Sequence, residues 1–295
     1  MRGVAARADG DSAVSSRSCW RESRSCWSGR LRRHTWQSLT PAVGHDGDVA
    51  AYAEFAEFYD QVMGDRSPLI ERVRGYIERY LPAAESLLEL GCGTGAVLAG
   101  LAPGLRVTGV DRSPEMLATA SRNAAAASLV QADITTLSLG TRFDVVICVF
   151  DTLNHLPTFD SWRKVFGRVH GHLAEGGLFV FDVNTIGRLT RLSRAPAYVE
   201  DFGPHTLIMD VTPGEGNVSL WDVRIFEQVN GDEFRLHHER IPELGVPLTV
   251  IHEALAANFE LLEATDPDGG RATDESNRVY FVYRHRAAGG GDQGA

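Results

Sequence analysis

A glycine-rich turn between an apolar segment and a helical one is the strongest chemical signal in the sequence. Residues 87–95 read LLELGCGTG, and a Cβ at Gly91 or Gly93 would hold the backbone away from a bound nucleoside. Asp111 ends the next apolar segment, about 20 residues further on, where a carboxylate can accept both ribose hydroxyls of a nucleotide cofactor. The G-x-G-x-G spacing departs from the G-x-G-x-x-G of dinucleotide folds, which argues against an NAD-dependent oxidoreductase.

The same turn resembles the first motif of class I S-adenosylmethionine-dependent methyltransferases. The resemblance covers roughly Tyr52 to Arg284 and continues in DRSPEM at 111–116, QADI at 131–134 and FDVV at 143–146. It implies S-adenosylmethionine as the cofactor and S-adenosylhomocysteine as its product, and a metal is not expected. We therefore expect a methyltransferase that acts on a small molecule.

Carried over residue by residue, the resemblance implies a set of cofactor contacts. The glycine-rich backbone approaches the methionine part, Asp133 takes the adenine amino group, and Ile134 packs on the adenine face. Met116 or Arg112 flanks the adenine, although ordinary helix packing is the alternative for Met116. Phe150 lies beside the donor methyl group. The expected cofactor-binding residues are Glu89, Gly91, Cys92, Gly93, Gly95, Asp111, Arg112, Met116, Asp133, Ile134 and Phe150.

The acceptor is expected beyond the carboxyl ends of the fourth and fifth strands, where ligands of open α/β sheets bind. The loop DTLNHL at 151–156 resembles that of glycine, sarcosine and deoxysugar N-methyltransferases, which have a histidine at the position of His155. Those relatives also carry a helix with a sequence like FYD at 58–60, and an aromatic hydroxyl such as Tyr59 can lie near the sulfonium. Asp151 stands where the glycine enzymes have Asn, which favours a cationic amine. The catalytic candidates are therefore His155, Tyr59 and Asp151.

Methyl transfer from a sulfonium is a displacement in which positioning can supply about 7–11 kcal/mol. A general base adds roughly 10²–10⁴-fold, and histidine suits this task because it titrates near neutrality. We expect His155 to take the acceptor proton, with a purely structural role in the loop as the alternative. The favoured acceptor is an amine nitrogen of a metabolite, an amino sugar or a natural-product intermediate.

Two other functions remain open from the sequence. Asp151, Asp182 and Asn184 offer oxygen ligands of the kind that Mg²⁺ prefers, as in catechol-type O-methyltransferases. Val183 separates the last two, whereas those enzymes have adjacent Asp and Asn, so a small-molecule O-methyltransferase, Mg-dependent or metal-free, is the second reading. A third reading is a protein that binds S-adenosylmethionine without methylating, because a fold does not determine function.

The elements that position these residues are expected to form a Rossmann-like α/β fold with a seven-stranded methyltransferase sheet. Apolar strands alternate with amphipathic helices, and Ser113-Pro114 marks a helix start. An antiparallel β insertion follows the fifth strand, where Asn230-Gly231 is a strong hairpin signal. Strands are expected at 86–90, 106–110, 129–132, 145–149, 178–183, 206–211, 218–229, 233–239, 259–265 and 278–284, and helices at 49–62, 68–80, 96–102, 114–127, 162–173 and 248–258.

The chain is expected to divide into five segments. Residues 1–44 form a basic tail that is disordered or an extension, and 45–184 form the N-terminal helices and the S-adenosylmethionine-binding core. The β insertion at 185–247 either covers the acceptor or makes a homodimer contact. Residues 248–286 complete the core, and 287–295 form a second disordered tail.

Charge and composition further restrict the classes of partner that the protein can bind. The net charge is −10, and residues 1–40 contain eight Arg against three acids, which is +5, so the rest of the chain carries −15. An acidic folded part argues against binding to nucleic acid or to anionic membranes. No apolar run approaches the roughly 18 residues that a membrane span needs. With four cysteines, too few for a disulfide scaffold, a cytoplasmic protein is expected.

Overall fold

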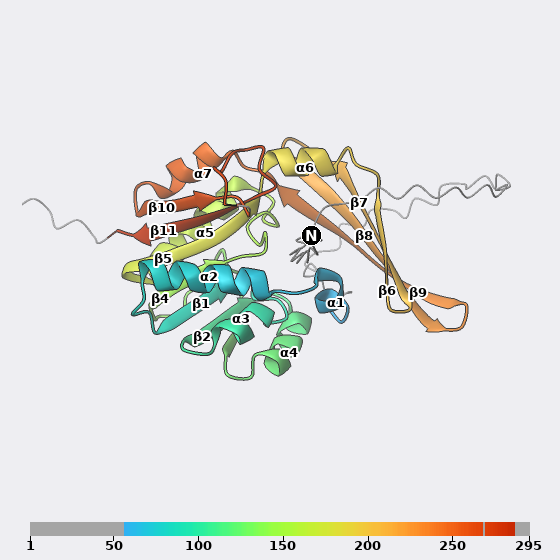
Figure 1. Ribbon diagram of the computed structural model, residues 1–295, viewed down its shortest axis with the longest axis horizontal. Helices are drawn as coiled ribbons and strands as arrows, with labels where there is room; N and C mark the ends of the chain where they lie inside the picture. Colours follow the sequence, from blue (N-terminus) through green and yellow to red (C-terminus); the bar gives the residue numbers. More distant parts are fainter. Residues whose placement is uncertain (1–55, 268, 287–295) are drawn as a thin grey trace, which may run out of the picture. The chain divides into compact units, whose positions relative to one another are not determined.

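The computed structural model describes residues 56–267 and 269–286 and is shown in Figure 1. The chain divides into two units, Met1–Asp46 and Gly47–Ala295, and every described residue belongs to the second. The expected tails, and the first part of the expected helix at 49–62, lie outside the described residues. Only its end is described, as the short helix α1 (Tyr59–Met63).

A seven-stranded sheet forms the core, in the order β10-β11-β5-β4-β1-β2-β3. Neighbours within β1–β5 pair in parallel, whereas β11 runs antiparallel between β5 and β10. The central strands are buried on both faces, which explains their nearly continuous apolar sequences. The expected fold class is confirmed. The strands are β1 (Ser86–Leu90), β2 (Arg106–Asp111), β3 (Ser128–Gln131), β4 (Phe143–Cys148), β5 (Leu173–Asn184), β10 (Phe259–Thr265) and β11 (Arg278–His285).

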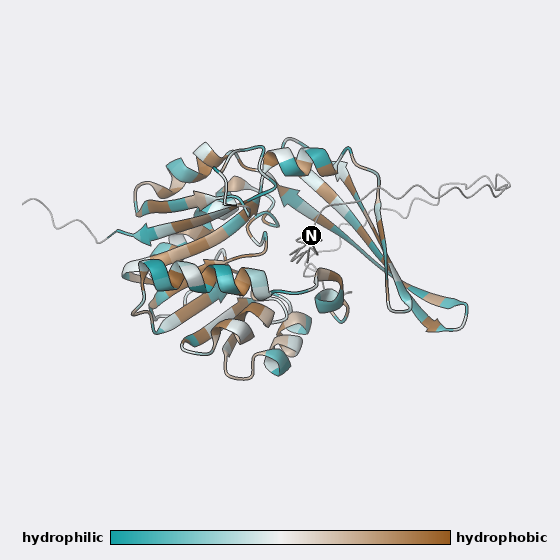
Figure 2. Cartoon of the chain, viewed as in Figure 1, coloured by the Kyte–Doolittle hydropathy of each residue, from teal (hydrophilic) through white to brown (hydrophobic). Residues whose placement is uncertain are grey.

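Helices cover both faces of this sheet. One apolar cluster joins Val73 and Tyr76 of α2 to Leu98 of α3, and another joins Trp162 of α5 to Ile251 of α7. Figure 2 shows hydrophobic residues along the central strands and mixed hydropathy on the helices. The helices are α2 (Ser67–Tyr80), α3 (Ala96–Leu101), α4 (Pro114–Asn123), α5 (Phe159–His172) and α7 (Leu248–Leu255). None of the helices in the described ranges is long and apolar enough to cross a membrane.

A second, four-stranded antiparallel sheet follows β5, in the order β6-β7-β8-β9. Its apolar face packs against Phe58, which precedes α1, and against Leu189 of α6, through Leu207, Trp221 and Ile225 among others. This sheet therefore holds the start of the described chain next to the core. The elements are α6 (Ile186–Leu192), β6 (Tyr198–Phe202), β7 (His205–Pro213), β8 (Val218–Asn230) and β9 (Glu233–Leu244).

The structure differs from the sequence expectation at three places in this region. β6 was not expected, because the exposed residues in its middle hide any apolar alternation, and its pairing with β7 stabilises it. α6 was also not expected. β9 continues to Leu244 rather than ending at 239, through Pro242, which a strand accommodates when it lies at the edge of a sheet.

Candidate active site

A cavity of about 440 Å³ opens at the carboxyl ends of β1, β2 and β4. This is where ligands of open α/β sheets bind. The cavity is lined by both the glycine-rich turn and the loop after β4, so it brings together the expected donor and acceptor residues. The expected residues in its wall are Tyr59, Glu89, Gly91, Cys92, Gly93, Asp111, Arg112, Met116, Asp133, Ile134, Phe150 and His155.

The glycine-rich turn requires glycine for two physical reasons. Gly91 and Gly93 have φ values of +72° and +51°, in the left-handed region that favours glycine. A Cβ at Gly91 would also collide with the side chain of Thr152, which lies in the loop after β4. The turn and that loop are therefore in close contact.

Asp111 is held rigidly at the end of β2. Its Oδ2 accepts a hydrogen bond from the Gly93 amide at 2.8 Å, and its Oδ1 accepts one from the Ser113 amide at 2.9 Å. Each carboxylate oxygen keeps a further lone pair. The carboxylate is thus oriented in advance and can still accept two hydroxyl groups.

The far end of the cavity has an acid beside apolar side chains. Met116 is 3% exposed, and its amide donates to Ser113 Oγ at 3.1 Å, which is the helix cap expected at Ser113. Asp133 Oδ1 accepts from the Thr135 amide and hydroxyl, both at 2.7 Å, which fixes the carboxylate next to Ile134. A flat heterocycle with an exocyclic amino group fits this set of side chains.

Gly95, the last expected residue of the glycine-rich turn, does not line the cavity. It is the N-cap of α3 with a φ of +75°, and a Cβ there would lie 3.0 Å from the Cβ of Ala120 in α4. The residue is required for the turn into α3 and for the close packing of α3 on α4.

Tyr59 is fixed over the cavity by its neighbour in α1. Thr94 Oγ1 donates to Asp60 Oδ1 at 2.6 Å, and Asn123 Nδ2 donates to Asp60 Oδ2 at 3.2 Å. Burial, with a further contribution from Asp151, raises the pKa of Tyr59 above its usual value. Its hydroxyl group therefore stays protonated at neutral pH.

Two ionisable side chains in the cavity wall, one acidic and one basic, lack full hydrogen bonding within the described residues. Glu89 is 3% exposed and its Oε2 has no hydrogen-bond partner. Burial, with the nearby charge of Asp111, raises its pKa well above the usual range. Arg66 is 8% exposed, its Nη2 has no hydrogen-bond partner, and its guanidinium lies 4.3 Å from the Phe150 ring centroid. A ligand with both an ammonium and a carboxylate group fits this pair.

The loop after β4 begins with strained backbone. Phe150 and Asp151 have φ values of +63° and +55°, the non-glycine positive values among the described residues. Such conformations cost on the order of 1–3 kcal/mol each and persist where the surroundings hold them. Here both amides donate to the carboxylate of Asp182 in β5. This arrangement turns the Phe150 ring into the cavity wall.

Asp151, the catalytic candidate expected to suit a cationic amine, is bound by side chains of the protein itself. It does not line the cavity. Its Oδ1 accepts from Arg278 Nη2 at 3.0 Å and its Oδ2 from Asn184 Nδ2 at 3.0 Å. Arg278 also pairs with Asp182. Burial alone would raise the pKa of Asp151, but Arg278 and other nearby cations hold it below its usual value. The charge of Asp151 is therefore neutralised within the protein.

The same contacts bear on the alternative magnesium site. Arg278 places its guanidinium between Asp151 and Asp182, where a shared cation would have to lie. Asn184 turns its amide nitrogen toward Asp151 and Glu243. The two carboxylates thus bind a protein cation, and Asn184 directs its amide nitrogen toward one of them. The three candidate ligands therefore do not present oxygens to a common point.

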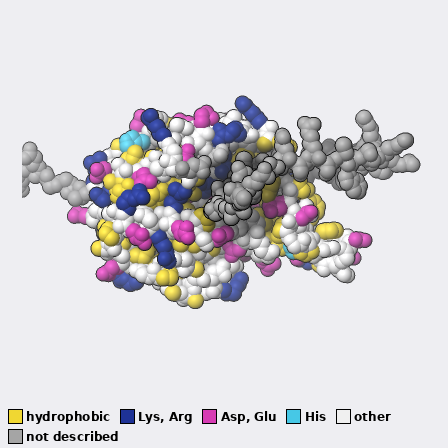
Figure 3. Space-filling model, in the orientation of Figure 1, with side chains coloured by type: hydrophobic (Ala, Val, Ile, Leu, Met, Phe, Trp, Pro, Cys, Tyr) yellow, Lys and Arg dark blue, Asp and Glu magenta, His cyan; other side chains and the backbone are white. Residues whose placement is uncertain are grey.

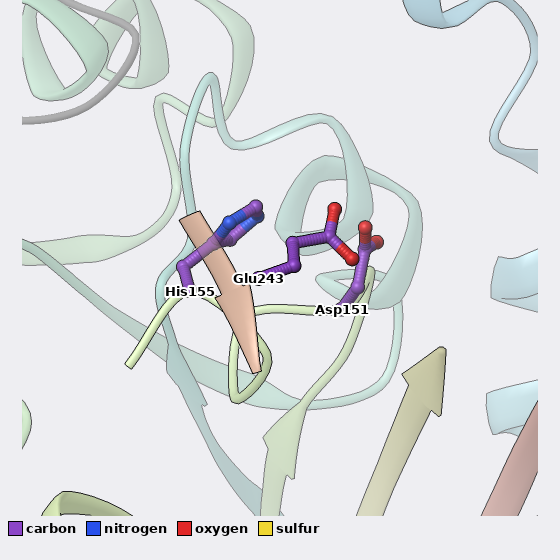
Figure 4. A group of neighbouring side chains, drawn as sticks. All are labelled: Asp151, His155 and Glu243. Carbon is purple, nitrogen blue, oxygen red and sulfur yellow. The ribbon is translucent and has the colours of Figure 1, made fainter. Parts of the chain in front are cut away.

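His155 lines the cavity and meets two carboxyl groups on its other side. A ring nitrogen of His155 and carboxyl oxygens of Asp151 and Glu243 lie within 4.8 Å of one another. Figure 4 shows these three neighbouring side chains. Burial lowers the pKa of His155, with Asp151 opposing this shift. The imidazole is therefore neutral at pH 7 and can accept a proton.

Several residues of the site were missed from the sequence. Arg66, Thr152, Arg240 and Pro242 also line the cavity, and Arg278 and Glu243 lie behind it. Arg278 is 127 positions from Asp151, so no local pattern connects them. For Arg66 a signal existed, because it follows closely after the FYD sequence at 58–60.

Figure 3 shows that Lys and Arg side chains are interspersed with Asp and Glu over the visible face of the described residues. Arg240 of β9, at the cavity, is paired with Asp222 at 3.2 Å. Among the arginines that line the cavity, Arg240 is thus held by an acid of the same chain, whereas Arg66 is bound to backbone carbonyl groups.

Comparison with known proteins identifies the class. Residues 87–177 match the family model of a methyltransferase domain. The fold is that of an S-adenosylmethionine-dependent methyltransferase from Clostridium acetobutylicum ATCC 824, with a TM-score of 0.72, 22% identity and coverage of 80% of this chain and 99% of that one. The chain is an S-adenosylmethionine-dependent methyltransferase, as expected.

Two relatives with named acceptor types are similar to it. The sugar N-methyltransferase KedS8 from Streptoalloteichus sp. ATCC 53650 has a TM-score of 0.68 and 25% identity, over 88% of this chain and 100% of that one. The dTDP-3-amino-3,6-dideoxy-alpha-D-glucopyranose N,N-dimethyltransferase of Streptomyces fradiae is 34% identical over 50% of this chain and 58% of its own length.

Proposed function

We propose that the protein transfers a methyl group from S-adenosylmethionine to an amine nitrogen of a small molecule, with an amino sugar as the favoured acceptor. One observation carries the proposal: a single cavity joins the rigid Asp111 and the glycine-rich turn to Tyr59 and His155. The likeness to KedS8 and to the Streptomyces fradiae enzyme supports nitrogen over oxygen.

The residues of the donor side fit the cofactor group by group. When bound, S-adenosylmethionine supplies a methyl group on a positively charged sulfur. Asp111 would accept the ribose hydroxyls, and Asp133 with Ile134 would hold the adenine. The unpartnered Oε2 of Glu89 would accept from the amino group of the methionine part, whose positive charge would favour the ionised carboxylate. Arg66 would bind the carboxylate of the methionine part, so both buried groups would gain the partners that they lack.

On the acceptor side, His155 takes the proton of the amine. An aliphatic amine is mainly an ammonium ion at neutral pH, and it has no lone pair for attack until one N–H bond breaks. The neutral imidazole can accept that proton, whereas the Tyr59 hydroxyl keeps its own and serves as a hydrogen-bonding group for orientation. Positioning supplies about 7–11 kcal/mol, and the base adds roughly 10²–10⁴-fold.

Incubation with S-adenosylmethionine and a mixed pool of amines, amino sugars, amino acids, phenols and catechols tests the proposal. Mass spectrometry is used to detect the gain of one methyl group, with and without EDTA. A methylated amine that EDTA does not affect is the expected result. A methylated catechol that EDTA abolishes would replace the proposal with a metal-dependent O-methyltransferase. Tight cofactor binding without any product would favour a non-methylating function.

Asp111→Ala should weaken S-adenosylhomocysteine binding by at least about 10-fold, because a charged acceptor of two hydrogen bonds contributes about 1.5–3 kcal/mol per bond. Isothermal titration calorimetry measures the dissociation constant. Asp232→Ala, at an exposed position of the β8–β9 turn, is the matched control and should leave affinity unchanged. Unchanged affinity in Asp111→Ala would contradict the ribose assignment.

A further inference from the structure

A buried carboxyl group from the second sheet lies directly behind the acceptor loop. Glu243, near the end of β9, is 3% exposed. Its neighbour Leu244 donates its amide to the Asn154 carbonyl at 2.7 Å, and Asn154 Nδ2 donates to the Leu244 carbonyl at 2.9 Å. These bonds hold the end of β9 against the loop that follows β4, so the position of Glu243 is set by the junction of the two sheets.

Glu243 lies between the imidazole and the buried ion pair. Figure 4 shows its carboxyl group between the ring of His155 and the side chain of Asp151. Asn184 Nδ2 donates to Glu243 Oε2 at 2.8 Å and to Asp151 Oδ2 at 3.0 Å. A ring nitrogen of His155 and a carboxyl oxygen of Glu243 lie within 4.8 Å of each other, a separation that one bridging water can span.

The two carboxyl groups differ in their charge at neutral pH. Arg278 keeps Asp151 ionised. Burial raises the pKa of Glu243 to about 8, the charge of Asp151 adds to this rise, and Asn184, Arg278 and Arg188 oppose it. Glu243 therefore exchanges its proton near neutral pH, whereas Asp151 does not.

We propose that Glu243 is a positioning residue of the acceptor site, which acts through His155 as the next carrier of the acceptor proton. The amine nitrogen loses its proton to His155, and His155 passes a proton to the ionised carboxylate of Glu243. The amine becomes neutral, the imidazole returns to its neutral form, and Glu243 becomes a neutral carboxyl group. This inference rests on the proposed function, because it requires an amine acceptor.

The kinetic test compares Glu243→Gln with the wild-type protein on dTDP-3-amino-3,6-dideoxy-α-D-glucopyranose across a pH series. The wild-type kcat should rise with a midpoint near pH 8, and Glu243→Gln should lack this rise. Its kcat above the midpoint should be about 10²-fold lower at an unchanged KM for S-adenosylmethionine. Glu233→Gln, exposed at the start of β9, should follow the wild type. A uniformly lower kcat with an unchanged pH profile would show a merely structural role and overturn the proposal.

A second measurement needs no turnover. ¹³C NMR of protein labelled at the glutamate carboxyl carbons should show a resonance that titrates near pH 8, is missing in Glu243→Gln and persists in Glu233→Gln. Methylation of an amine without such a resonance would overturn the proton route alone. If no amine in the mixed pool is methylated, the proposed function fails, and the proton route fails with it.

Discussion

Replacing Arg278 by leucine should lower the free energy of unfolding by about 3–5 kcal/mol, the usual cost of removing one partner of a buried ion pair. Arg278 is paired with Asp151 and Asp182, whose side chains are 14% and 0% exposed. Without the guanidinium, two carboxylates remain buried side by side. Urea unfolding followed by circular dichroism measures the loss, and the melting temperature should fall by about 2–4 °C per kcal/mol.

Two matched variants and a change of pH assign this loss to unpaired charge. Arg191→Leu removes an exposed pair with Glu275 and should cost less than about 1 kcal/mol. Arg278→Leu combined with Asp182→Asn should recover part of the loss. Without the arginine, the native pKa of the two acids should rise, so the native state gains protons and the defect should shrink as the pH falls from neutral toward the acid range. An equal loss of stability at neutral and at acid pH would contradict the assignment of this loss to unpaired charge.

Replacing His155 by glutamine should lower kcat by about 10²–10⁴-fold, the usual contribution of a general base. Affinity for S-adenosylhomocysteine should change little, because positioning of the cofactor depends on other residues. Burial holds the pKa of His155 below its usual value, so the wild-type imidazole should stay neutral at neutral pH. Its protonation should cause a further fall in rate only below the pKa of a free histidine, separate from the rise near pH 8 that we assign to Glu243. Steady-state methylation of the amine acceptor, followed by mass spectrometry, measures the effect.

A control and a rescue separate catalysis from structure. His238→Gln, whose side chain is 37% exposed and bound to Asp222, should retain the wild-type rate. At a pH where the acceptor is already a free amine, a base is no longer needed, so the defect of His155→Gln should shrink. A defect that is constant across the pH range would indicate that His155 only holds the loop.

The donor side could be predicted from the sequence because its parts are local. The strand, the turn with Gly91 and Gly93, and the start of α3 are consecutive, and Asp111 ends the neighbouring strand of a parallel pair. Apolar periodicity and turn chemistry are properties of short segments, and they place these residues at one edge of the sheet. The tight contact of Gly95 with Ala120 could not be predicted in this way, because Ala120 lies in another helix.

The acceptor side depended on tertiary structure. His155 and Tyr59 were expected from a resemblance, but the partners that set their chemistry come from distant strands: Arg278 from β11 and Glu243 from β9. Long-range strand pairing decides which strand lies beside β5 and where β9 ends against the loop after β4. No local sequence pattern contains this information.

The sequence by itself therefore determined the fold and the donor motif, since these follow from local periodicity and from backbone requirements, and its resemblance to known methyltransferases indicated the class. Only the tertiary structure decided which carboxyl groups are charged. A charge depends on burial and on the nearest opposite charge, and both arise when remote segments pack together. Asp151 thus became a paired structural acid, and Glu243 became the carboxyl group poised to exchange a proton with the acceptor site.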